Sequence, residues 1–216
     1  FVGARARRWR PATLGRVLAS LARVHRVLGL PDPTKNEDVR AAYRAAVRRR
    51  AAAGQGGQRQ AAGLTAGAVR AMLALLGGRL IDCRDRALLL AARDLLARRS
   101  ELVALCVADL APTGDGGATI RLGRSKTDRT GQGTYQYLGP PAYAAIRAWL
   151  RAARLTDGPL FRSVHATGRV GTGLHAGSVS AVLKKLAWRA APALRRQGID
   201  PEGVSGHSCR VGMAQD

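Results

Sequence analysis

Apolar residues recur with helical spacing through the first fifty positions of the chain. Between residues 14 and 28 they fall three or four apart, and Gly29 follows as a stop signal: Leu14, Val17, Leu18, Leu21, Val24 and Leu28. Thr34 and Glu37 have the spacing of a capping box, which predicts a second helix with Val39, Tyr43, Ala46 and Val47 on one side. The outer faces of the two helices carry arginines: Arg16, Arg23, Arg26, Arg48, Arg49 and Arg50.

The stretch from residue 54 to residue 63 has no apolar periodicity and is rich in Gly and Gln. Such a composition is typical of a flexible linker. We therefore expect a domain boundary here, with one domain over residues 1–53 and a second over residues 64–216.

The second part of the chain shows further helical patterns. Thr65 is placed to cap a helix that carries Val69, Met72, Leu73 and Leu76. Residues 86–97 are apolar nearly all round and predict a buried helix, after which Ser100 is the natural cap of a short one. Two more helices are expected, one opening at Pro140 with Ile146, Trp149, Leu150 and Ala153 buried, and one with Val179, Val182, Leu183 and Leu186 buried.

Two short segments alternate apolar and polar residues as strands do. They cover residues 118–123 and 133–138, and the polar, Gly-containing segment between them favours a β-hairpin. The predicted fold class is mainly α with a small antiparallel β-sheet.

Charge changes this picture most. The 216 residues include 36 Lys plus Arg against 14 Asp plus Glu, for a formal net charge of +22. So large an excess of positive side chains causes mutual repulsion in a compact fold unless a polyanion neutralises it. Nucleic acid is therefore the expected partner. On charge alone an anionic membrane surface, an RNA or ribosome partner, or a merely solvated cationic surface are the alternatives.

The cysteines, the apolar runs and the first residues of the chain bear on the cellular compartment. Three cysteines, Cys83, Cys106 and Cys209, have no metal-type spacing and favour a reducing cytoplasmic compartment. No apolar run approaches the roughly 18 residues of a membrane span, so we expect no membrane association. The chain opens Phe-Val-Gly without a Met and with no signal peptide, which suggests a fragment.

Four residues of the second domain are candidates for phosphate chemistry. Arg98 precedes Glu101 by three positions, Lys126 lies in the hairpin turn, and His207 and Arg210 share one face if their segment is helical. Each alone has a structural explanation, such as a helix-end charge, an ordinary loop lysine or a structural histidine.

Together these residues resemble the active site of the tyrosine recombinase (phage integrase) family. Residues 97–105 are similar to its first arginine motif, an Arg followed at the third position by Glu, and this register selects Arg98. Residues 124–127, Arg-Ser-Lys-Thr, resemble the hairpin that bears its lysine, and residues 205–212 its His-x-x-Arg box. The box and the helical segment over residues 13–33 are most similar to Cre-like members.

The resemblance implies a role for each residue. Arg98 and Arg210 would clamp the non-bridging oxygens of a DNA phosphate, because a guanidinium is always charged and offers a rigid fork of donors. His207 would donate to the same oxygens or assist proton transfer, Lys126 would protonate the leaving 5′-oxygen, and Glu101 would support the site. Arg124 and the arginines of the first domain would contact DNA, and neither a metal nor a cofactor is required.

The resemblance also implies a two-domain organisation and an assembly. Residues 1–53 would be part of a helical core-binding domain, and residues 64–216 an incomplete catalytic domain. The full-length protein would form a homotetramer on double-stranded DNA in the cytoplasm of a bacterium, encoded there or by a phage.

The family's nucleophilic tyrosine belongs a few dozen residues after the His-x-x-Arg box, and the chain ends at Asp216. Tyr43, Tyr135, Tyr137 and Tyr143 are expected to pack rather than to react. We therefore expect DNA binding without strand cleavage from these 216 residues. The alternative is a non-catalytic DNA-binding protein derived from a recombinase, and type IB topoisomerases share the chemistry but not the first domain.

Overall fold

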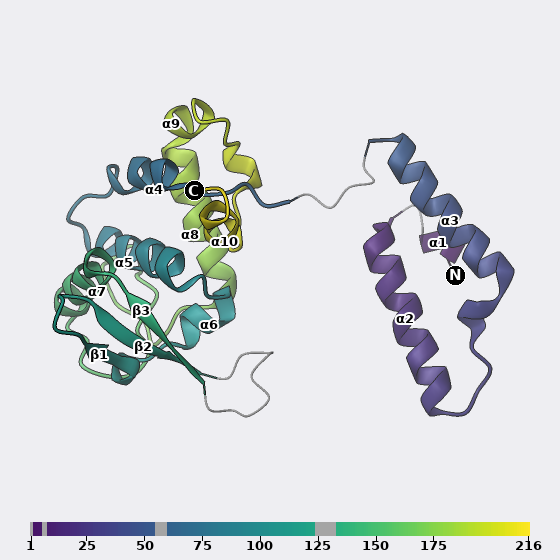
Figure 1. Ribbon diagram of the computed structural model, residues 1–216, viewed down its shortest axis with the longest axis horizontal. Helices are drawn as coiled ribbons and strands as arrows, with labels where there is room; N and C mark the ends of the chain where they lie inside the picture. The colour runs from purple at the N-terminus through teal and green to yellow at the C-terminus, as the bar shows by residue number, and fades with distance from the viewer. Residues whose placement is uncertain (1, 6–7, 55–59, 124–132) are drawn as a thin grey trace. The chain divides into compact units, whose positions relative to one another are not determined.

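The computed structural model describes residues 2–5, 8–54, 60–123 and 133–216. The chain divides into two compact units, residues 1–59 (unit 1) and residues 60–216 (unit 2), and the division falls inside the Gly- and Gln-rich stretch. The fold is mainly helical with one small antiparallel sheet, which confirms the predicted fold class (Figure 1).

Unit 1 contains two long helices. Its elements are α1 (Val2–Arg5), α2 (Pro11–Val27), η1 (Pro33–Lys35) and α3 (Glu37–Ala52). The predicted stop after α2 is confirmed, since Gly29 adopts a left-handed backbone with φ of 65°. The predicted capping box is wrong: Asn36, not Thr34, caps α3, because its side chain accepts a hydrogen bond from Asp38 N at 2.8 Å.

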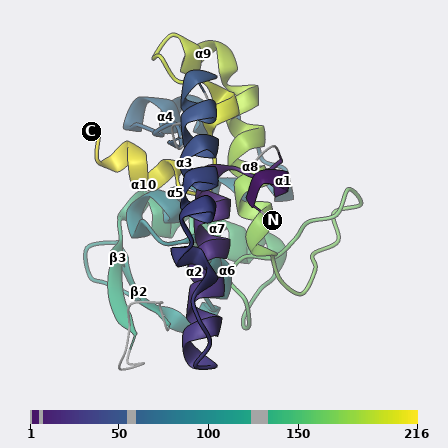
Figure 2. The same ribbon diagram turned by 90° about the vertical axis from the view of Figure 1, so that its right-hand side faces the viewer.

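Unit 2 carries the remaining elements. They are α4 (Ala66–Leu73), α5 (Leu80–Leu95), α6 (Arg99–Ala104), η2 (Val107–Asp109), β1 (Leu110–Pro112), β2 (Ala118–Leu122), β3 (Thr134–Leu138), α7 (Pro140–Ala153), α8 (Ala176–Arg189), α9 (Ala191–Arg195), η3 (Pro201–Gly203) and α10 (Ser208–Met213). The sheet lies at one end of the unit and α9 at the other (Figures 1 and 2).

Helix α5 is the central element of unit 2, because it contacts α7, α8, α10 and β3. It begins at Leu80, six residues before the predicted start, and its first turns bury charged side chains. Arg84 and Asp85 form an ion pair with both side chains buried, and Arg84 also donates to the carbonyl of Arg162. Apolar periodicity missed this part of the helix because paired charges occupy buried positions.

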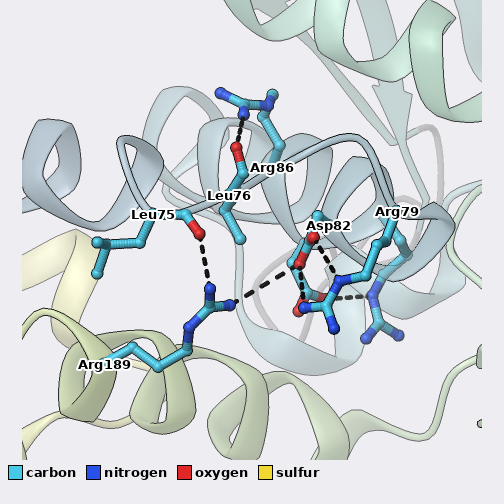
Figure 3. Close-up of polar contacts among 8 residues, drawn as sticks. Leu75, Leu76, Arg79, Asp82, Arg86 and Arg189 are labelled. Carbon is cyan, nitrogen blue, oxygen red and sulfur yellow. Dashed lines mark hydrogen bonds and ion pairs between the residues drawn. The ribbon is translucent and has the colours of Figure 1, made fainter.

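Arginines also fasten the turn that joins α4 to α5 (Figure 3). Arg189 of α8 donates to the carbonyl of Leu75, and Arg86 of α5 donates to the carbonyl of Leu76. Asp82, whose side chain is buried, accepts two hydrogen bonds from Arg79 and lies 3.8 Å from Arg189. Part of the large positive charge therefore serves internal contacts rather than an external ligand.

The sheet has the strand order β1-β2-β3, and both pairs are antiparallel. Strands β2 and β3 confirm the predicted hairpin, whereas β1 was not expected. Ala118, Ile120 and Leu122 of β2 face the core, and the outer face carries exposed side chains. The expectation that Tyr135 and Tyr137 pack is wrong, because 71% and 47% of these residues are exposed.

The described residues contain neither a membrane-spanning helix nor a metal-binding cluster. No helix in the described ranges is long and apolar enough to cross a membrane. Those ranges also contain no group of three or more His, Cys, Asp or Glu residues arranged to hold a metal ion.

Candidate functional site

Arg98 lies in the sharp turn between α5 and α6. Leu96 ends α5 in a left-handed conformation with φ of 46°, and two residues later Arg98 is the N-cap of α6. The Glu101 carboxylate accepts hydrogen bonds from Arg98 N at 2.7 Å and from its guanidinium at 2.8 Å. The predicted cap at Ser100 is therefore wrong, since the carboxylate of the third helical residue satisfies the N-cap amide.

The pKa of Glu101 also depends on the charge of Arg210. Burial acts to raise the pKa of Glu101, but the hydrogen bonds from Arg98 and the charges of Arg98 and Arg210 outweigh it and lower the pKa below its usual value. Arg210 thus acts on the carboxylate that orients Arg98. Arg98 is hydrogen-bonded to the carboxylate, and Arg210 acts on it through its charge alone.

His207 and Arg210 sit at the beginning of the short helix α10. His207 is the N-cap of this helix, Arg210 is its third residue, and both side chains are exposed. Three serines hold the turn before the helix. Ser205 N donates to Oγ of the buried Ser208 at 2.9 Å, His207 N donates to Ser205 Oγ at 3.3 Å, and Gly206 N donates to Oγ of Ser180 on α8 at 3.2 Å.

The segment from residue 62 to residue 64, here called the strap, runs beside α10. Ala62 N donates to the carbonyl of Gly203 at 3.0 Å, and Leu64 N donates to that of Ser208 at 2.9 Å. Gly212 approaches so closely that a Cβ there would lie 2.1 Å from the Leu64 carbonyl oxygen. Arg93 of α5 donates to the same carbonyl at 2.9 Å and pairs with Asp216. The strap fixes the element that carries Arg210.

Arg98 lines a hollow of about 680 Å³ between α6 and β2. Arg121 of β2 lines the same hollow, and its Nε lies 3.5 Å from Oδ1 of Asp109. The other oxygen of Asp109 accepts from Cys106 N at 2.8 Å. Sequence reasoning missed Arg121, and the only signal available was its outward position between Ile120 and Leu122 in the alternating strand.

The remaining predicted residues fall into two groups. Lys126 and Arg124 lie outside the described residues. The predicted arginines of unit 1 line the outer faces of α2 and α3, where Arg50 is half-buried and the others are exposed: Arg16, Arg23, Arg26, Arg48 and Arg49. The structure therefore pairs Arg98 with Glu101 and places the turn before α10 beside α6, with His207 as the N-cap and Arg210 as the third residue of α10.

The tyrosines lie on other elements. Tyr43 is on α3 and packs against the small core of unit 1, and Tyr143 is on α7, partly buried with Arg147 over its ring at 5.8 Å. Tyr135 and Tyr137 are on β3, and Tyr137 donates a hydrogen bond to Asp115.

A curated protein is similar to this chain in sequence. No family model matches the chain. The chain is 33% identical over 143 residues to an integrase/recombinase XerD homolog of Selenomonas ruminantium, an alignment that covers 63% of this chain and 40% of that protein. The chain thus spans less than half the length of this curated relative.

A solved recombinase structure shares the fold. The XerH site-specific recombinase, in a pre-cleavage complex with its difH substrate, aligns with 94% of this chain and 58% of its own, with a TM-score of 0.52 and 15% identity. The XerA recombinase aligns with 94% of this chain and 66% of its own, with a TM-score of 0.48 and 14% identity. The mainly helical fold with its three-stranded sheet is that of the XerH structure.

Proposed function

We propose that this chain belongs to the tyrosine recombinase family and acts in site-specific DNA recombination, with Arg98, His207 and Arg210 as its phosphate clamp. The observation that carries the proposal is that the turn before α10, which leads into His207 and Arg210, lies beside the start of α6, where Glu101 holds Arg98: a Cβ at Gly206 would lie 3.7 Å from the Arg99 side chain. The likeness to the XerD homolog and to the XerH structure supports it. Double-stranded DNA is the proposed partner, and a homotetramer on DNA the proposed assembly of the full-length protein.

The chemistry of the clamp follows from its groups. A phosphodiester under attack gathers negative charge on its non-bridging oxygens, and fixed guanidinium donors stabilise that charge best in a site that need not reorganise. Glu101 holds Arg98 in place before any ligand arrives. His207 would donate to the same oxygens, and Lys126 would protonate the leaving 5′-oxygen.

We propose the two-domain organisation on the same grounds, with residues 1–53 as part of a core-binding domain, 54–63 as a linker and 64–216 as part of a catalytic domain. The proposed Cre-like relationship rests on the residues around the His207 box and on the helical segment over residues 13–33, whereas the sequence relative is a XerD homolog.

DNA binding at the clamp is tested by fluorescence anisotropy with a labelled duplex over a range of salt concentrations. Each phosphate contact contributes about −0.9 to the slope of log K against log salt. We expect Arg98→Ala and Arg210→Ala each to reduce the slope by about one contact. Arg151→Ala is the matched control, because Arg151 is exposed on α7 and does not line the hollow. Equal losses in all three variants would show that binding depends on total charge and not on this site.

Strand cleavage is a separate measurement. None of the four tyrosines of the chain lies on α6 or α10, so we expect these 216 residues to bind a nicked duplex without forming a covalent adduct. Incubation with the nicked duplex, followed by denaturing electrophoresis, reports the adduct directly. A DNA-linked band that disappears in Tyr135→Phe or Tyr137→Phe would contradict this expectation and identify the nucleophile.

A further inference from the structure

A second arginine, Arg121, lines the hollow beside Arg98. Arg98 lies at the N-terminus of α6, and Arg121 lies on strand β2, which follows η2 in the sequence. Both side chains line the same space of about 680 Å³, which is within the range of sizes found for ligand sites. The sequence patterns that single out Arg98 say nothing of Arg121.

The two arginines are held in the same way. Glu101 binds the guanidinium of Arg98 at 2.8 Å, and Asp109 lies 3.5 Å from that of Arg121. Each carboxylate is also fixed to backbone, Glu101 to Arg98 N and Asp109 to Cys106 N. A guanidinium has five donors, so each arginine keeps donors for another partner.

Exposure decides which charge faces the hollow. The side chains of Arg98 and Arg121 are 39% and 53% exposed, whereas those of Glu101 and Asp109 are 14% and 17% exposed. The carboxylates therefore lie behind the guanidinium groups, and an incoming ligand meets the cations first. Surface ion pairs of this kind add little stability, typically 0–1 kcal/mol, so fold stability does not account for both pairs.

We propose that Arg121 binds a second DNA phosphate, on the same backbone as the phosphate bound by Arg98. This inference rests on the proposed function, because it takes duplex DNA as the ligand. The Arg121–Asp109 pair positions one phosphate relative to the clamp and so fixes the register of the DNA on α6 and β2. It confers no base preference, because phosphate contacts carry no sequence information.

The salt dependence of DNA binding tests the contact. We expect Arg121→Ala to reduce the slope by about one contact and to weaken binding about tenfold at 0.1 M salt, whereas Arg151→Ala leaves the slope unchanged. Arg121→Lys should keep the slope and lose part of the affinity, because an ammonium cannot form the bidentate contact. If Arg98→Ala reduces the slope and Arg121→Ala does not, this inference fails and the proposed function stands. If neither variant changes it, both fail.

A second measurement needs no variant at Arg121. Cys106 lines the hollow and is partly exposed, Cys83 is also partly exposed but does not line it, and Cys209 is buried. With the wild-type chain we expect duplex DNA to slow alkylation of Cys106 and to leave that of Cys83 unchanged, as read by mass spectrometry of the labelled peptides. Unchanged alkylation of Cys106 at saturating DNA would overturn the inference, even if Arg121→Ala proved unable to fold.

Discussion

Gly212 is the residue at which α10 comes closest to the strap. A Cβ at this position would lie 2.1 Å from the Leu64 carbonyl oxygen and 2.6 Å from Leu64 N, and both are backbone atoms that cannot swing aside. The absence of a side chain at Gly212 thus allows α10 to pack against the strap.

We expect Gly212→Ala to lower the free energy of unfolding by about 1–3 kcal/mol, the usual cost of forcing extra volume into a packed site. Urea unfolding followed by circular dichroism measures the change. Gly78→Ala is the control, because nothing lies within 4 Å of its Cβ position and its backbone is not left-handed. A Gly212→Ala variant as stable as Gly78→Ala would refute the close contact.

Asp115 gives a prediction about pH. Hydrogen bonds from the Thr113 hydroxyl, the Tyr137 hydroxyl and Gly117 N lower its pKa from 3.8 to about 2. A folded-state pKa below the unfolded value means that the stabilisation is fully present above pH 3.8 and is lost as the pH falls through about 2. We expect the difference in unfolding free energy between the wild type and Asp115→Asn to be constant above this window and to shrink within it. A difference that persists at the lowest pH would contradict the assignment.

At the level of elements, a buried tryptophan of α7 forms a hydrogen bond with the segment that follows the helix. Trp149 is fully buried, and its Nε1 donates to the carbonyl of Leu160 at 2.8 Å. We expect Trp149→Phe to cost about 2–4 kcal/mol, because it leaves a void and a buried carbonyl without a partner. Trp188→Phe, at a residue that is 46% exposed, should change stability by less than about 0.5 kcal/mol in the same denaturation experiment.

Elements with a clean apolar stripe and a clear cap could be predicted from the sequence. Thr65 caps α4, Pro140 opens α7, and the buried residues of α8 are those expected from the spacing. The first turns of α5 could not, because charged residues are buried there with partners that lie far away in sequence. Asp82 lies 3.8 Å from Arg189, and Arg84 donates to the carbonyl of Arg162. Strand β1 was missed since it has three residues, too few for alternation to show.

The candidate site was predictable only in part for the same reason. Arg98, His207 and Arg210 stand in local motifs that can be read along the chain. Arg121 stands in none, and only the packing of β2 against η2 brings it to Asp109 and into the hollow. Contacts of this kind between residues far apart in sequence depend on tertiary structure and produce no periodic pattern in the sequence.

For the whole molecule, the two units differ in how much they bury. Among the described residues of unit 1, the core cluster is Leu14 and Ala46 with Trp9 and Tyr43 packed against it. Unit 2 has a larger core, to which every helix from α4 to α10 contributes and which includes Leu89, Ile120, Trp149 and Leu183. Little buried apolar surface means a low free energy of local opening.

We therefore expect the backbone amides of α2 and α3 to exchange with deuterium much faster than those of α5 and α7. Hydrogen exchange read by mass spectrometry on the full chain measures both at once. Equal protection in the two units would show that unit 1 gains stability from contacts that its own core does not supply.

The strap has a consequence for the order of folding. Its two backbone hydrogen bonds join residue 62 to residue 203 and residue 64 to residue 208, so nearly the whole of unit 2 lies in the loop that they close. Closing so long a loop costs chain entropy that local contacts do not repay, and during synthesis the strap leaves the ribosome well before its partners exist. Arg98 can thus be in place on α6 while Arg210 is still unanchored. We therefore expect the proposed clamp to be among the last features of these 216 residues to assemble.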